Sequence, residues 1–169
     1  MKPYIFAAAS FSHDGNYRFS LSRTWDDSRP SVTWIMCNPS TASVIRDDPT
    51  VRKCVAISNA NGYGALTVVN LFAKCATDPR ELTRVEDPEG RENFEHVFRT
   101  PPGSDVVAAW GNSVFRAGVE RSSVAQNFQS FMRHRRILHL GLTKLKQPRH
   151  PLYVAINTPL SELSFVAVK

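Results

Sequence analysis

Several polar side chains suited to hydrogen-bonding and acid–base chemistry follow apolar runs directly in this sequence. The run VTWIMC is followed by NPST at 38–41, and Asp47 and Asp48 come soon after. Asn70 ends the apolar run ALTVVN, and His150 precedes a proline in RHPLY. Amide and carboxylate oxygens can orient or deprotonate a water, and an imidazole can donate a proton or a hydrogen bond. A loop that only turns the chain needs fewer such groups, so we interpret this segment as the rim of an active site.

Alternating strand and helix patterns predict the elements that would position these groups. Short, nearly continuous apolar runs are typical of parallel strands covered on both faces. We therefore predict a three-layer α/β/α fold with a central, mainly parallel four-stranded sheet, plus an N-terminal β-hairpin. The predicted strands are 32–37, 65–72, 105–110 and 136–140, the predicted helices are 48–62, 88–99 and 113–133, and the hairpin strands are 3–11 and 16–25.

The chain length of 169 residues fits a single domain, 1–169, with the hairpin in 1–28 and the α/β core in 30–155. In parallel sheets, ligands bind beyond the carboxyl ends of the strands. Those ends carry Asn38, Asn70, the pair Gly111 and Asn112, and the loop that leads to His150. The topology thus predicts that these stretches meet in one crevice.

Charge and cysteine usage limit the class of partner. The net charge is +6, and residues 116–150 contain eight Lys or Arg and one acid. Such clustering favours DNA as a partner, although a solvated basic helix face would give the same pattern. The three cysteines are widely spaced, so we expect no metal, no iron–sulfur cluster and no cofactor. No apolar run is long enough to span a membrane, and we expect a cytoplasmic monomer.

Four motifs occur in the order and at the strand ends seen in the uracil-DNA glycosylase superfamily, which the chain resembles. They are CNPST at 37–41, TVVNLFAKC at 67–75, VVAAWGN at 106–112 and RHPLY at 149–153. The chain also resembles, more closely, a small bacterial and phage family of unknown function in which these stretches recur. The first resemblance implies cleavage of the N-glycosidic bond of an uncommon or modified base that is flipped out of DNA.

The same resemblance implies catalytic roles for Asn38 and His150. His150 would stabilise negative charge on the departing base, and Asn38 would hold the attacking water. Fast members of that superfamily carry Asp where this chain has Asn38, and an amide cannot remove a proton. Asp47 or Asp48 are possible sources of the missing carboxylate, although Asp48 is also placed to cap a helix. His150 has two simpler explanations, which are a turn before proline and a phosphate contact.

Base recognition would rest on Asn70, whose amide matches the edge of a pyrimidine, unless it is an ordinary core amide. Phe72, or alternatively Tyr63 or Trp34, would stack on the base. Further residues would contact the DNA backbone, with Leu152 as a wedge in the duplex. The predicted backbone contacts are Ser40, Thr41, Gly111, Asn112, Lys144, Lys146, Arg149 and Leu152.

Two other functions remain open at the level of sequence. A nucleic-acid-binding module without chemistry is favoured by Asn38, which lacks an acidic function. An enzyme that acts on free nucleotides would need the same pocket but not the basic stretch. A role in base-excision repair and a role in phage defence are both open alternatives for a DNA glycosylase.

Overall fold

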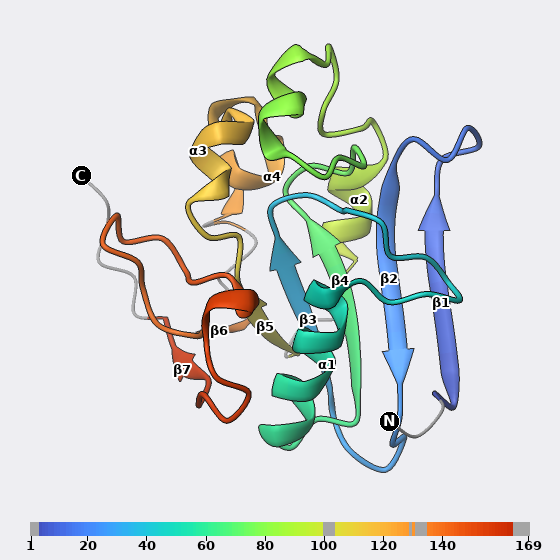
Figure 1. Ribbon diagram of the computed structural model, residues 1–169, viewed down its shortest axis with the longest axis vertical. Coiled ribbons are helices and arrows are strands. Elements are labelled where there is room, and N and C mark those ends of the chain that lie inside the picture. The colour runs from blue at the N-terminus through green and yellow to red at the C-terminus, as the bar shows by residue number, and fades with distance from the viewer. Residues whose placement is uncertain (1–3, 100–103, 129, 131–134, 164–169) are drawn as a thin grey trace.

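In the computed structural model, which describes residues 4–99, 104–128, 130 and 135–163, seven strands form one mixed sheet. The strand order is β1-β2-β4-β3-β5-β6-β7 (Figure 1). The strands are β1 (Phe6–Phe11), β2 (Arg18–Thr24), β3 (Ser31–Met36), β4 (Ala65–Asn70), β5 (Asp105–Ala108), β6 (Arg136–His139) and β7 (Ser161–Glu162).

The four predicted central strands pair in parallel in the order β4-β3-β5-β6. The predicted hairpin is also present, but its second strand continues the same sheet because β2 pairs antiparallel with β4. At the other edge, β7 pairs antiparallel with β6. The sheet is therefore larger and more mixed than the predicted four-stranded sheet with a separate hairpin.

Helix α1 (Pro49–Ala60) covers one face of the sheet and begins as predicted. The Asp48 carboxylate accepts a hydrogen bond of 2.8 Å from the backbone N–H of Val51, and Pro49 occupies the first turn, where no N–H is required. Val51, Cys54 and the residues that follow on that face are buried against β3 and β4. The helix ends just before Gly62, whose φ of +90° suits glycine.

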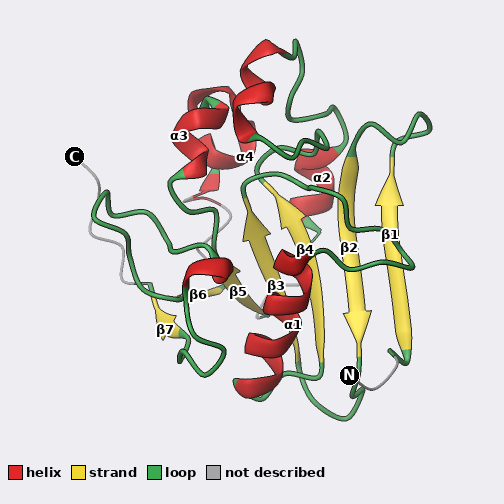
Figure 2. Cartoon of the chain, viewed as in Figure 1, coloured by secondary structure: helices red, strands yellow, loops and turns green. Residues whose placement is uncertain are grey.

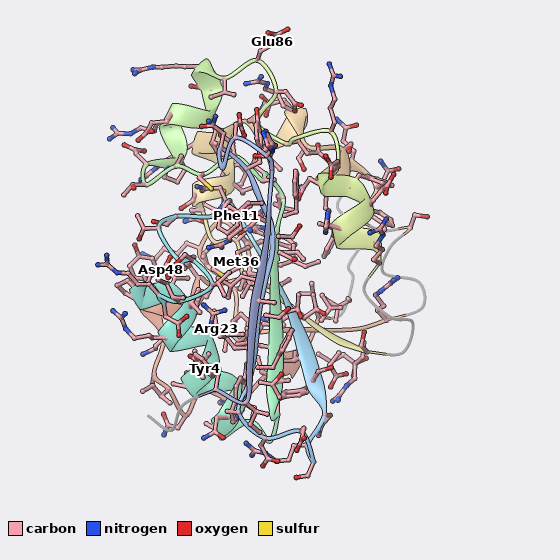
Figure 3. The ribbon with its side chains drawn as sticks, turned by 90° about the vertical axis from the view of Figure 1, so that its right-hand side faces the viewer. Tyr4, Phe11, Arg23, Met36, Asp48 and Glu86 are labelled. Atoms are coloured by element: carbon pink, nitrogen blue, oxygen red, sulfur yellow. The ribbon has the colours of Figure 1, made fainter. Side chains whose placement is uncertain are left out.

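Shorter helices cover the opposite face, so that a helix layer lies on each side of the sheet (Figures 2 and 3). Viewed toward β1 in Figure 3, α1 and α2 lie on opposite sides of the sheet. These elements are η1 (Pro79–Arg84), α2 (Asn93–Phe98), α3 (Ser113–Ala117), η2 (Val119–Arg121) and α4 (Ser123–Gln126), and η3 (Pro151–Tyr153) follows β6.

The long helix predicted over 113–133 is wrong. Gly118 adopts a left-handed conformation with φ of +76°, which ends α3 after five residues. The Ser122 side chain then caps a separate helix, α4. The predicted helix 88–99 is also shorter, because Gly90 turns the chain with φ of +83° before α2 begins. Phe131, within the predicted helix, lies outside the described residues.

A buried ion pair joins the hairpin to the loop before α1. The Arg23 guanidinium, 1% exposed, contacts the Asp47 carboxylate at 2.7 Å and 2.9 Å. Tyr4 donates a hydrogen bond to the same carboxylate, and Arg23 also donates to the carbonyl of Ser43. Figure 3 shows Tyr4 and Arg23 beside α1, on the side of the sheet where Asp48 lies. Asp47 therefore holds the loop 38–48 against β2.

We expect Asp47→Asn to lower the free energy of unfolding by about 3 kcal/mol, because it leaves the buried Arg23 charge uncompensated. Urea unfolding measures this change. Glu95→Gln is the control, since it breaks an exposed pair with Arg99 and should cost less than about 0.5 kcal/mol. Equal losses in the two variants would contradict a structural role for the buried pair.

Candidate functional site

A cavity of about 390 Å³ opens at the carboxyl ends of β3 and β4, between the start of α1 and the His150 loop. This volume is in the range of small-molecule sites. The cavity brings together seven of the predicted site residues. Those that line it are Asn38, Ser40, Thr41, Asp48, Asn70, His150 and Leu152, and they are joined there by Arg18, Met36, Cys37, Val68, Arg116 and Tyr153 among others.

Asn70, the last residue of β4, has the most unusual environment in the cavity. Its side chain is 1% exposed, and neither Oδ1 nor Nδ2 has a hydrogen-bond partner among the described residues. An unpaired buried amide is costly, so native cores rarely contain one. Asn70 is therefore no ordinary core amide bonded to a neighbouring loop, and the described residues leave its donors and acceptor unsatisfied.

Asn38 differs from Asn70, because its side-chain amide nitrogen already has hydrogen-bond partners in the protein. Its Nδ2 donates to the carbonyl of Ala76 at 2.7 Å and to the carbonyl of Pro39 at 3.0 Å. These bonds fix the amide so that Oδ1 is the group left to accept from a water or a ligand. The geometry suits positioning of a water but provides no base at this residue.

Asp48 combines two roles that the sequence presented as alternatives. Its Oδ1 caps α1, and the residue also lines the cavity. Its Oδ2 has no hydrogen-bond partner in the part of the chain that the structure describes. The carboxylate is 7% exposed, and its charge acts on both His150 and Arg18. Asp48 is therefore the carboxylate positioned to accept a proton in this cavity.

His150 immediately precedes η3 and lines the cavity. Burial lowers its pKa to about 4, although the negative charge of Asp48 acts in the opposite direction. The imidazole is thus neutral at neutral pH. Its Nδ1 accepts a hydrogen bond of 3.4 Å from the backbone N–H of Leu152, which leaves the proton on Nε2. His150 can therefore donate one hydrogen bond through Nε2.

The loop that carries His150 is fastened to the end of β5. The N–H of Gly111 donates to the carbonyl of Pro148 at 2.9 Å, and Thr143 donates to Asn112 at 2.8 Å. Gly111 has φ of +64°, and a Cβ built on it would lie 3.1 Å from the Cβ of His150. Gly111 is therefore required by both its backbone conformation and the close approach of His150.

Basic residues gather at the mouth of the cavity. A second hollow of about 490 Å³ shares His150 and Tyr153 with the cavity and includes Arg116 and Arg149. Lys144 and Lys146 are exposed on the same loop but line neither hollow. Some of the other basic side chains in residues 116–150 bind to the protein itself.

Four arginines of that stretch have structural partners among the described residues, since Arg135 donates to the carbonyl of Phe98 at 3.3 Å and Arg149 to that of Leu142 at 3.2 Å. Arg121 donates to backbone carbonyls, including those of Val85 at 2.6 Å and Glu86 at 2.8 Å. Arg136 forms an ion pair with Asp105 at 3.5 Å. The charge available to a polyanion is therefore smaller than the sequence count suggests.

Besides Lys144 and Lys146, three predicted site residues line neither hollow. Strand β4 ends at Asn70, so the alternation of faces fails beyond it, and Phe72 is fully buried in the cluster on the opposite face. Tyr63 precedes β4 and donates to Asp105 at 2.5 Å. Asp47 is engaged with Arg23. Trp34, considered as a stacking alternative to Phe72 and Tyr63, is a core residue.

Arg18, which is absent from the predicted site, lines the cavity from β2 and is 2% exposed. The pairing of β1 with β2 is irregular at this point, because Ser10 pairs with Ser20 whereas Phe11 pairs with Arg18. The extra residue, Phe19, allows Arg18 to share a face with Arg23. Strict alternation would put Arg18 on the other face, so no sequence signal marked it. Tyr153, 81% exposed, is the aromatic residue at the rim.

Metal-ligand clusters and membrane-spanning helices are both absent from the described residues. No group of three or more His, Cys, Asp or Glu among them is arranged to hold a metal ion. No helix in the same part of the chain is long and apolar enough to cross a membrane.

A family model described as "Protein of unknown function (DUF1643)" matches residues 18–152, a span that begins at Arg18 and includes His150. This match supports the predicted likeness to a family of unknown function. No curated protein and no solved structure matches the chain. The resemblance to uracil-DNA glycosylases therefore stays a prediction.

We expect Gly111→Ala to lower the free energy of unfolding by about 2 kcal/mol. The added Cβ would be strained by the positive φ and would also lie too close to His150. Gly15→Ala is the matched control, because Gly15 has φ of +70° but nothing within 4 Å of an added Cβ. It should cost about 1 kcal/mol. Urea unfolding and the NMR shifts of the His150 ring measure the difference. Equal costs and unchanged shifts would show that the close approach is not limiting.

We expect NMR titration to place the pKa of His150 near 4. Because this pKa is lower than that of an unfolded histidine, about 6.5, the unfolded chain binds more protons between these values. The stability contribution of neutral His150 is therefore complete above about pH 6.5 and is lost as pH falls toward 4. Asp48→Asn, which keeps a good helix cap, should lower the pKa of His150 further. Titration near 6.5 would contradict burial of the ring.

Proposed function

The chain belongs to the DUF1643 family, and we propose that it cleaves the N-glycosidic bond of an uncommon or modified base that is flipped out of DNA. The observation that carries this proposal is the fully buried, unpaired amide of Asn70 in a cavity shared with Asn38, Asp48 and His150. An amide left without partners is what a base edge with complementary donors and acceptors would satisfy.

In this reaction the oxygen of a water attacks C1′ of the sugar, and the electron pair of the C1′–N bond leaves with the base. Asn38 Oδ1 accepts from the water, and Asp48 takes its proton. His150 donates from Nε2 to the base, where negative charge develops. Asn70 binds the base edge. Each role uses an atom that the protein's own hydrogen bonds leave available.

The mouth of the cavity supports DNA as the carrier of the base. Arg116 and Arg149 border it, Lys144 and Lys146 lie on the same loop as Arg149, and Leu152 is 44% exposed at the rim. Cations in this position would contact phosphates on each side of a flipped nucleotide. Tyr153, in place of Phe72 or Tyr63, is the aromatic residue available for stacking on a base.

We expect Asn70→Ala to reduce the rate of base release by about 10- to 100-fold, the value of one or two hydrogen bonds to the substrate. Its stability should change little, because the amide removed has no partner in the protein. The measurement is release of free base from oligonucleotides that contain uracil, modified pyrimidines or modified purines, with urea unfolding in parallel.

Asn61→Ala is the matched control for that experiment. The Asn61 amide donates to the carbonyls of Ile57 and Thr158 and accepts from the N–H of Leu160. This variant should lose about 1–3 kcal/mol of stability and keep its rate of base release. If no substrate releases its base while salt-sensitive DNA binding persists in His150→Ala, the chain is a binding module without chemistry. Tight binding of mononucleotides without DNA binding would instead indicate an enzyme of free nucleotides.

A further inference from the structure

Two buried arginines of β2 differ sharply in how their charge is compensated. Arg23 is held by Asp47, with Tyr4 bonded to the same carboxylate. Arg18 is equally buried, but its one side-chain hydrogen bond is from Nη1 to the carbonyl of Ala42, at 3.1 Å. Its Nε has no partner, and no ion pair to Arg18 exists among the described residues. Arg18 therefore brings an uncompensated positive charge to the cavity.

The neighbouring groups do not remove this imbalance. Burial lowers the pKa of Arg18, and Asp48 acts against that effect from outside ion-pair distance, yet a guanidinium stays protonated in proteins. The unpaired amide of Asn70 lines the same cavity from β4, the strand next to β2. A buried charge is retained at a cost unless something pairs with it. A guanidinium and an amide that line one cavity offer several donors to one ligand.

We propose that Arg18 and Asn70 form an anion-binding site in the cavity, which takes a group that carries negative charge and at least two acceptor atoms. The inference rests on the proposed function only for the identity of that anion, which in the reaction above is the departing base. Arg18 then neutralises the charge that the electron pair of the broken bond brings to the base, and His150 donates beside it. A phosphate would satisfy the same donors, and the experiment separates the two sources.

Isothermal titration calorimetry in phosphate-free buffer tests the site with three probes and requires no turnover. The probes are inorganic phosphate, 5-nitrouracil, which is ionised at neutral pH, and uracil, which has the same ring and is neutral there. We expect 5-nitrouracil to bind at least tenfold more tightly than uracil. Phosphate binding without 5-nitrouracil binding would keep the anion site but assign it to a phosphate group.

Arg18→Met keeps the apolar stem and should weaken anion binding at least tenfold. Arg99→Met removes the same charge from an exposed site and should change it less than twofold. The melting temperature of Arg18→Met should not fall, because an unpaired buried charge is removed. If that variant does not fold, Arg18→Lys replaces it and should weaken binding of the planar base more than that of phosphate.

Binding of neither anion at millimolar concentration, or equal binding by Arg18→Met and the parent chain, would overturn the anion site. Anion binding that depends on Arg18 in a chain that releases no base would keep the site and reject the glycosidic reaction. The two proposals therefore fail separately.

Discussion

The buried ion pair between Arg23 and Asp47 is the contact on which the geometry of the cavity depends. It joins the antiparallel hairpin to the loop 38–48, whose two ends carry Asn38 and Asp48. With Tyr4 and the carbonyl of Ser43 as further partners, the pair is well satisfied for a buried charge. The hairpin is thus part of the site's framework, since β2 provides both the anchor of this loop and Arg18.

A second set of hydrogen bonds positions the opposite wall of the cavity. The loop 142–150 is bonded to the end of β5 at Gly111 and Asn112, and Gly111 lets His150 approach closely. Both walls therefore rest on the carboxyl ends of parallel strands, which are rigid supports. Asn70 needs no loop, because it belongs to β4 itself. The result is a cavity whose two loop walls are held in place by the protein's own contacts.

Local signals made part of this arrangement predictable from sequence. Asp48 and Pro49 start a helix by short-range chemistry, and the central strands could be read from their apolar runs. Non-local pairing was not predictable in the same way. The irregular pairing near Arg18 depends on β1, and Phe72 turned to the other face because β4 ended two residues earlier. The helix after Ser113 failed at Gly118, where a positive φ outweighed a helical apolar pattern.

The presence of asparagine rather than aspartate at position 38 has a structural reason. Its Nδ2 faces the carbonyl oxygens of Pro39 and Ala76, and a carboxylate there would place oxygen against oxygen. An acid at this position is therefore incompatible with the way the loop is closed. In the proposed reaction, the carboxylate that activates water would come from another residue, and Asp48, at the far end of the same loop, is the acid that lines the cavity. In the proposed reaction, Asn38 would position the water and Asp48 would take its proton, and the Arg23–Asp47 pair holds the loop that carries both residues.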